Sequence, residues 1–355
     1  MRDFKDIWKA PDRLAPWIVA ELSGNHNGDL GRALDLIDVA ADCGVDAIKL
    51  QTYTADTITL DIPKKEFVVD KPGSVWHGRT FHSLYQEAHT PWEWHAALAQ
   101  RARECGMEWF SSPFDATAVE FLETLAPACY KIASPEIIDL PLISQCARTG
   151  KPMVISTGMA TVSEIGDAVD TARRNGCDSL ILLKCTTNYP SSPETSNLRT
   201  IAHMAELFGC PTGVSDHTLG IGAAVAATAL GAVLIEKHLT LRRAEGGPDS
   251  HFSLEPHEMK ALVKETKVAF QALGKIQYGP QETEKASMQG RRSLYVTTDM
   301  KAGEVFSESN VRSVRPGLGL SPKYLEVILG KKINKAVPAG TALSWDLIGL
   351  TNLSD

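Results

Sequence analysis

The chain has 355 residues, of which 43% are hydrophobic and 22% are charged, a composition typical of a globular protein. Its formal net charge of -7 offers no general attraction to nucleic acid or to an anionic membrane, so we expect neither as a partner. The N-terminus lacks the apolar core of a signal peptide. Seven scattered cysteines without a CxxC pair indicate reduced thiols and a cytoplasmic protein.

Eight short apolar runs rich in Val, Ile and Leu predict strands that are buried on both faces. In chain order they read WIVAEL, AIKLQT, MEWFSSP, CYKIAS, PMVISTG, LILLKCT, TGVSDH and LIEKHLT. A helix-like stretch is expected after each run, at 29–44, 91–106, 115–125, 140–150, 162–176, 198–209, 221–231 and 256–274. Most of these stretches end at a glycine suited to a left-handed cap. Eight strand–helix repeats favour a closed (β/α)8 TIM barrel over an open doubly wound sheet.

Two connections between these repeats are long. The first, 53–90, follows the second strand, and the second, 187–196, follows the sixth. Long connections at the carboxyl ends of barrel strands cover the active rim and often set substrate choice. For 53–90 two interpretations stay open: a lid over the site, or a surface excursion that contacts another subunit.

The sequence changes character after Gly279-Pro280. Residues 281–290 are polar and helix-like, and 291–355 breaks into short strand-like runs with turn signals: LYVT, KAGE, VRPGLG, KAVPAG and TALSW. We therefore expect a barrel domain over 1–280, a linker over 281–290 and a small, mostly β domain over 291–355.

Two histidines end neighbouring strands of the predicted barrel. His217 ends the seventh strand and His238 ends the eighth. Adjacent strands lie about 5 Å apart, so two imidazoles at equal height can share a divalent ion and leave positions open for water and substrate oxygen. Mg, Mn and Co all fit such a site. The alternative is that each histidine only caps a turn.

Lysines and hydroxyls also gather at the predicted rim. Lys49 and Lys131 end the second and fourth strands, and four serines end other strands: Ser112, Ser134, Ser156 and Ser215. Two ammonium groups with several hydroxyls can hold a phosphate or carboxylate. The alternative is a lysine paired with a rim carboxylate.

Two glutamates, Glu21 and Glu136, are the carboxylates at strand ends. Either could orient sugar hydroxyls or move protons, or could pair with Lys49 or Lys131. Asp249, in GGPDS after the eighth strand, could reach the same rim.

These motifs together resemble the sialic acid synthase family. The resemblance is carried, in order, by AELSGNHNGDL, AIKLQTY, SSPFD, YKIASPE, ISTGMA, CTTNYP, GVSDHTLG, IEKHLT, GGPD, SLEP and VRPGLG. It implies an enzyme that joins phosphoenolpyruvate to an N-acylated amino sugar, giving a nonulosonic acid and phosphate. It also implies a C-terminal antifreeze-like (SAF) domain, and a domain-swapped homodimer in which that domain covers the partner's barrel.

Within the family, the sequence motifs are most similar to those of the pseudaminic acid synthases. The features are GRTFHSLYQEAHTPWEWH, the form GGPDS, and FSLEP. They imply 6-deoxy-2,4-diacetamido-altrose as the acceptor sugar. Neuraminate or legionaminate synthesis by the same mechanism is the alternative. One departure is Thr187, which stands where some neuraminate synthases have Asn.

The resemblance also implies roles for single residues. His217 and His238 would bind the metal, and Glu21 and Glu136 would take part in catalysis. The residues implied to bind substrate are Lys49, Gln51, Ser112, Lys131, Ser134, Ser156, Thr187, Tyr189, Ser215, Asp249 and Arg315. Of these, Arg315 would come from the partner's small domain.

Two further interpretations are weaker. A barrel enzyme that joins phosphoenolpyruvate to a phosphorylated sugar would need a second phosphate site, and the sequence offers no spare basic cluster. A non-catalytic carbohydrate-binding or morphogenetic protein would be expected to lack a metal histidine or a pocket lysine, and this chain keeps all of them.

Overall fold

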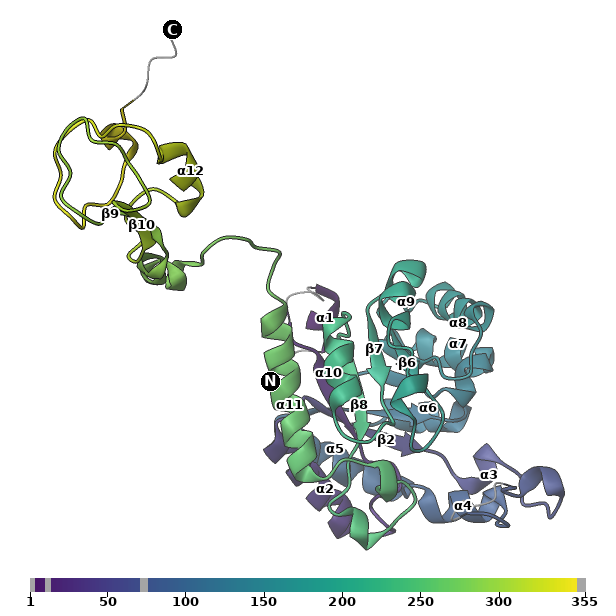
Figure 1. Ribbon diagram of the computed structural model, residues 1–355. Helices are drawn as coiled ribbons and strands as arrows, with labels where there is room; N and C mark the ends of the chain where they lie inside the picture. The colour runs from purple at the N-terminus through teal and green to yellow at the C-terminus, as the bar shows by residue number, and fades with distance from the viewer. Residues whose placement is uncertain (1–3, 10–13, 71–75, 350–355) are drawn as a thin grey trace. The chain divides into compact units, whose positions relative to one another are not determined.

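The computed structural model describes residues 4–9, 14–70 and 76–349 and divides into two units, Met1–Gly274 and Lys275–Asp355. The first unit is a closed barrel of eight parallel strands, in which β8 pairs with β1 (Figure 1). The strands are β1 (Trp17–Glu21), β2 (Ala47–Thr52), β3 (Glu108–Pro113), β4 (Tyr130–Ile132), β5 (Met153–Ser156), β6 (Leu180–Cys185), β7 (Thr212–Ser215) and β8 (Leu234–His238). Each predicted apolar run therefore forms a strand, and the (β/α)8 barrel is confirmed.

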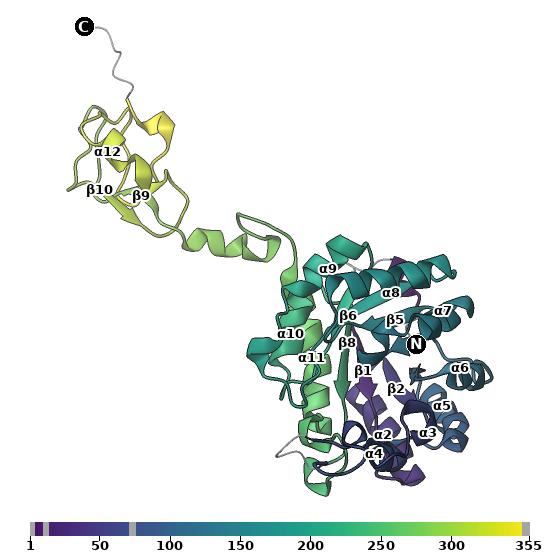
Figure 2. The ribbon, with the colours of Figure 1, turned by 90° about the vertical axis from the view of Figure 1, so that its right-hand side faces the viewer.

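Helices surround the barrel on the outside, as Figure 2 shows. They are α2 (Leu30–Cys43), α5 (His95–Glu104), α6 (Ala116–Glu123), α7 (Leu140–Arg148), α8 (Val162–Arg174), α9 (Thr200–Phe208), α10 (Gly222–Ala229) and α11 (Pro256–Leu273). In α2 the side chain of Asp29 accepts a hydrogen bond from Arg32 N at 2.6 Å, and Gly44 ends the helix with φ 80°. These caps satisfy backbone groups that the helix itself leaves unpaired, which explains why both boundaries were readable in the sequence.

The amino-terminal end of the barrel is closed by α1 (Asp6–Lys9). Phe4 and Ile7 are buried there, and the Phe4 ring lies 5.2 Å from that of Trp17 and 6.1 Å from that of Phe110. This plug was not predicted. Figure 1 shows α1 at one end of the barrel and α3 (Ala55–Ile58) and α4 (Phe81–Ala88) at the other, beside the carboxyl ends of the strands.

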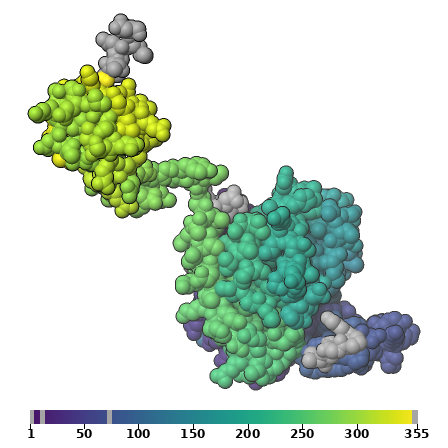
Figure 3. Space-filling view, viewed as in Figure 1, coloured from purple at the N-terminus to yellow at the C-terminus, as the bar shows by residue number. Residues whose placement is uncertain are grey.

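The long connection 53–90 is partly helical. It contains α3, the short 3-10 turn η2 (Lys65–Phe67) and α4, whose first turn is capped by Thr80. Figure 3 shows this connection as a lobe beside the barrel. Because α3 and α4 lie next to the active rim, the segment is placed to shape the site.

The second unit contains one antiparallel pair, β9 (Ser293–Val296) and β10 (Val311–Val314). Its other elements are η8 (Glu282–Glu284), η9 (Ala286–Gly290), η10 (Pro322–Tyr324), α12 (Leu325–Ile328) and η11 (Trp345–Leu347). Of the five predicted runs, only LYVT forms a strand among the described residues. KAGE is a turn, and Val337 and Ala342 make single bridges to Met300 and Tyr295. The described part of the small unit forms several β-bridges between backbone segments, but it has fewer regular strands than expected.

The boundary between the units falls at Gly274–Lys275, a few residues before the expected domain end at 280, and the expected linker 281–290 carries η8 and η9. The second unit has its own apolar core, which includes Leu294, Phe306 and Leu343. No helix in the described part of the chain combines the length and the apolar character needed to cross a membrane.

Candidate functional site

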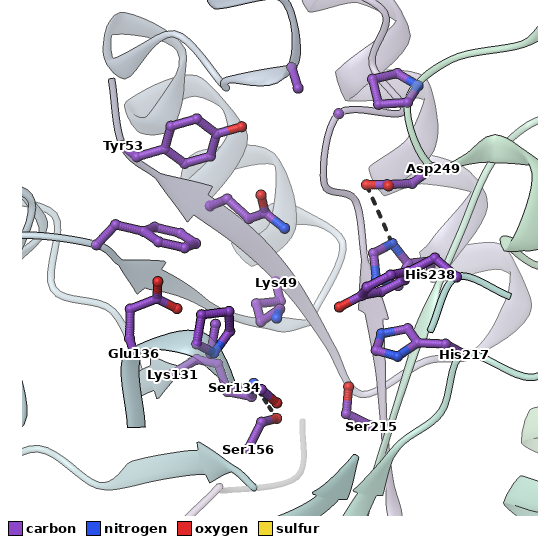
Figure 4. Close-up of a pocket in the computed structure, with 18 of the residues that line it drawn as sticks. Lys49, Tyr53, Lys131, Ser134, Glu136, Ser156, Ser215, His217, His238 and Asp249 are labelled. Atoms are coloured by element: carbon purple, nitrogen blue, oxygen red, sulfur yellow. Dashed lines mark hydrogen bonds and ion pairs between the residues drawn. The ribbon is translucent and has the colours of Figure 1, made fainter. Parts of the chain in front are cut away.

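A cavity of about 480 Å³ opens at the carboxyl ends of the strands. Lys49, Lys131 and Glu236 lie at its floor, and Figure 4 labels the two lysines. Lys49 Nζ lies 2.6 Å from Glu21 Oε2 and 3.0 Å from Glu236 Oε1, while Lys131 Nζ lies 3.8 Å from Glu236 Oε2. All four side chains are almost completely buried. For Lys49, the sequence left open a pairing with a carboxylate at the rim. The structure shows this pairing, and Glu21 is one of the two partners.

Glu236 is a site residue that sequence analysis missed. Burial alone would raise the pKa of its carboxyl group, but Lys131 and Lys49 hold that pKa well below its usual value, so Glu236 is ionised. The signal was present in the strand itself. Residues two apart on a strand point to the same side, so Glu236 must share the barrel interior with His238. Glu236 lies inside β8, whereas the predicted site residues stand at strand ends.

The serine hydroxyls are arranged around these charges. Lys131 Nζ donates to Ser156 Oγ at 2.7 Å, and Ser215 Oγ donates to Glu236 Oε1 at 3.0 Å. Ser134 Oγ accepts from the backbone N–H of Gly158 at 3.0 Å. A Cβ at position 158 would lie 2.7 Å from Ser134 Oγ, so glycine is required for this close approach. The wall around Lys131 therefore presents an ammonium group and hydroxyls to the cavity.

The two histidines face each other at the rim. Their ring centroids are 5.3 Å apart. His217 Nδ1 lies 2.8 Å from Thr186 O, and His238 Nδ1 lies 3.3 Å from Ser23 Oγ. A carbonyl oxygen can only accept, so Nδ1 of His217 carries a proton, and in the neutral ring the lone pair is on Nε2. A metal-binding histidine is commonly oriented in this way by a carbonyl.

This pair fits a divalent ion, but it supplies only part of a coordination shell. Among residues 4–9, 14–70 and 76–349, no group of three or more His, Cys, Asp or Glu side chains is arranged to hold a metal. Asp249 Oδ2 lies 3.9 Å from His238 Nδ1, on the side of the ring that faces Ser23. The remaining ligands would therefore be water or substrate oxygens, as an open catalytic site requires.

The two predicted carboxylates have different surroundings. Glu21 is fully buried, and besides pairing with Lys49 it accepts a hydrogen bond from Ser23 N at 2.7 Å. Glu136 lines the cavity in η4 (Pro135–Ile138), directly after β4. Burial raises the pKa of Glu136 to about 7. Within the described chain its Oε2 is buried without a hydrogen-bond partner. Glu136 can therefore gain or lose a proton near neutral pH.

The cavity brings together most of the predicted site residues: Lys49, Gln51, Lys131, Ser134, Glu136, Ser156, Tyr189, Ser215, His217, His238 and Asp249. Among the described residues predicted for the site, Glu21, Ser112 and Thr187 do not line it. Ser112 is buried within β3, and Glu21 contacts Lys49, which does line the cavity. Arg315 is an exposed residue of the second unit.

The cavity also has an uncharged wall that was not predicted residue by residue. Tyr53, Ile58, Leu84 and Tyr85 come from the connection after β2, and Phe114 follows β3. Figure 4 shows Tyr53 and Glu136 on one side of the cavity, opposite His217 and His238.

Comparisons with known proteins identify the family. The chain matches the NeuB family over residues 36–278 and the SAF domain over residues 291–349. It is 43% identical over 333 residues to a pseudaminic acid synthase from Helicobacter pylori, covering 93% of this chain and 97% of that protein. It is 35% identical over 340 residues to an N,N'-diacetyllegionaminic acid synthase from Legionella pneumophila, covering 94% of each.

Solved structures show the same fold. An N-acetylneuraminic acid synthetase from Leptospira borgpetersenii, in complex with citrate, aligns with a TM-score of 0.69 and 32% identity over 78% of this chain and 92% of that one. A 3-deoxy-D-arabino-heptulosonate 7-phosphate synthase from Thermotoga maritima is 16% identical with a TM-score of 0.55, over 73% of this chain and 87% of that one, and supports the barrel fold alone. The family match covers more than half of the chain, and this protein belongs to the NeuB family of sialic acid synthases.

Proposed function

We propose that this protein is a pseudaminic acid synthase, which condenses phosphoenolpyruvate with 6-deoxy-2,4-diacetamido-altrose to give pseudaminic acid and phosphate. The observation that carries this proposal is the single cavity in which Lys131, the hydroxyls and the histidine pair converge, in a chain 43% identical to a pseudaminic acid synthase. Neuraminate and legionaminate synthesis are the alternatives. They rank lower because the relatives with those names are less similar to this chain.

In the proposed reaction, C3 of phosphoenolpyruvate forms a bond to the aldehyde carbon of the open-chain sugar. Water adds to C2, and the bond from C2 to the bridging oxygen breaks, so that phosphate leaves with that oxygen. The attacking water loses both of its protons as C2 becomes a ketone: the aldehyde oxygen gains one, and the departing phosphate takes the other. Glu136, with its pKa near 7, is the residue we assign to this proton movement.

The residues at the floor would bind the phosphate and carboxylate of phosphoenolpyruvate. Lys131 Nζ is 3.8 Å from Glu236 and hydrogen-bonds Ser156, so an anion can displace the weaker carboxylate contact. Lys49 is held more tightly between Glu21 and Glu236, and it would contribute its charge with less freedom to move. Gln51, Tyr189 and Asp249 would face the sugar.

We also propose a divalent cofactor, Mn, Mg or Co, held by His217 and His238. Such an ion supplies Lewis-acid polarisation of a carbonyl oxygen when bound. The support for it is the facing pair of imidazoles, with Thr186 O orienting one ring and Ser23 near the other.

The family resemblance further leads us to propose a homodimer in which Arg315 of one copy contributes to the other copy's phosphoenolpyruvate site. We propose a cytoplasmic location, which the seven free cysteines support.

The reaction class is tested by placing a heavy-oxygen label in the bridging position of phosphoenolpyruvate. Release of labelled phosphate supports cleavage between carbon and oxygen. Unlabelled phosphate would mean cleavage between phosphorus and oxygen and would contradict the proposed reaction.

A further inference from the structure

The two sides of the cavity differ in chemistry. Strands β2, β4 and β8 supply Lys49, Lys131 and Glu236. The opposite wall is built by the connection after β2 together with Phe114. Its tyrosines carry hydroxyl groups, but Ile58 and Leu84 present only aliphatic carbon, so a ligand group that reaches these two side chains must be apolar.

The wall is held in place by contacts among its own aromatic rings and by hydrogen bonds next to them. The Tyr53 ring meets Phe114 edge to face at 5.1 Å and Tyr85 at 5.7 Å. Trp92 Nε1 donates to Tyr53 O at 3.2 Å, and Ser83 N donates to Thr80 Oγ1 at the start of α4. Ile58 belongs to α3 and Leu84 to α4, so these contacts position the two helices that bring both side chains to the cavity.

The reacting end of the acceptor has to lie between the histidine pair and the lysines, because the aldehyde carbon meets phosphoenolpyruvate there. The far end of the open-chain sugar can then reach Ile58 and Leu84, which line the same cavity. A hydroxyl group pressed against aliphatic carbon loses its hydrogen bonds to water without replacement, whereas a methyl group gains by leaving water.

We propose that Ile58 and Leu84 form a methyl-binding surface that selects an acceptor lacking a hydroxyl group at C6. This inference rests on the proposed function and adds the residues that determine the acceptor. An apolar pocket discriminates against an added hydroxyl only modestly. We therefore expect kcat/KM to favour the 6-deoxy sugar over its 6-hydroxy counterpart by roughly 10- to 100-fold.

The test measures phosphate release with both acceptors in the full-length protein and in the variants Ile58→Asn, Leu84→Asn and Leu84→Ala. We expect the asparagine variants to lower the preference for the 6-deoxy sugar several-fold, with KM for phosphoenolpyruvate unchanged. Leu84→Ala should lose activity with the 6-deoxy sugar without gaining activity with the 6-hydroxy sugar. Leu60→Asn is the matched control, because Leu60 lies in the same connection, is 54% exposed and does not line the cavity.

The outcomes separate this inference from the proposed function. Two results would overturn the methyl-binding role alone. The first is equal phosphate release from both sugars by the wild-type protein. The second is an unchanged preference in both asparagine variants, provided that these variants keep the wild-type melting temperature. No release from either sugar by the wild-type protein would overturn the proposed function, and this inference with it.

Discussion

Lys49 Nζ and Glu236 Oε1 lie 3.0 Å apart at the floor of the cavity, both nearly inaccessible to solvent. A second carboxylate, Glu21, contacts the same ammonium group at 2.6 Å. Two lysines and two glutamates therefore form a nearly neutral cluster, so an entering anion meets charges that are already paired. Binding of phosphoenolpyruvate must redistribute these pairs, and the contact at Lys131 is the longest and weakest of them.

Replacing Glu236 by Gln should make the protein's stability depend on anions. Removal of one partner from a buried pair leaves an uncompensated charge, which typically costs about 3 kcal/mol of unfolding free energy. A bound anion replaces the lost negative charge, so phosphoenolpyruvate should raise the melting temperature more in Glu236→Gln than in the wild type. Equal shifts in thermal denaturation would contradict the role of Glu236 as counter-charge to the lysines.

Glu136 should give the protein a pH-dependent stability term. The pKa of Glu136 is raised by burial from 4.5 to about 7, so its protonated form favours the folded state. That contribution is present below pH 4.5 and is lost as the pH rises through about 7. The unfolding free energy of wild type relative to Glu136→Gln should therefore fall across this range, as urea denaturation at several pH values would show.

The same residue should appear in the kinetics. An inflection near pH 7 in the wild-type profile of kcat/KM should be absent from Glu136→Gln. If the inflection persists unchanged in the variant, another group moves the proton.

His217→Ala should abolish binding of Mn²⁺ and turnover while leaving the circular dichroism spectrum unchanged. The reason is that one of the two facing imidazoles is removed without disturbing the barrel core. His257→Ala is the control, because the His257 side chain is 74% exposed at the start of α11. Full wild-type activity after chelation of divalent metal would contradict the proposed cofactor.

Arg315→Ala should raise KM for phosphoenolpyruvate by roughly 10- to 100-fold, the range expected for loss of a charge-assisted hydrogen bond. Arg312→Ala, an exposed arginine of the same unit, should leave this KM unchanged. Mixing Arg315→Ala with His217→Ala protein and allowing subunits to exchange tests the dimer. Recovered activity supports a contribution from the partner, because only a mixed dimer rebuilds one complete site, and no recovery would contradict it.

Sequence patterns predicted the barrel well because each strand and helix is marked by local physical chemistry. Asp29 caps the N-terminus of α2 and Gly44 ends the helix, so both signals are local to α2. The polar residues after each strand identify the rim of the barrel. The features that the sequence did not predict depend on contacts between segments far apart in the chain. The pairing of Lys49 with Glu21 and Glu236 joins three strands, and the plug formed by Phe4 depends on the barrel being closed.

The small unit shows the opposite limitation. Its turn signals were clear, but a run such as KAVPAG pairs through one bridge at Val337 and does not extend into a strand. Short runs can satisfy their backbone groups in several ways, so periodicity alone could not separate strands from isolated bridges. The uncharged wall was missed at residue level because helices α3 and α4 were interpreted as a loop.

The most direct measurement is phosphate release from phosphoenolpyruvate in the presence of Mn²⁺, with 6-deoxy-2,4-diacetamido-altrose and N-acetylmannosamine compared as acceptors. We expect release with the altrose sugar alone. Release with N-acetylmannosamine alone would contradict the proposed acceptor, and release with neither would contradict the synthase activity proposed for this cavity.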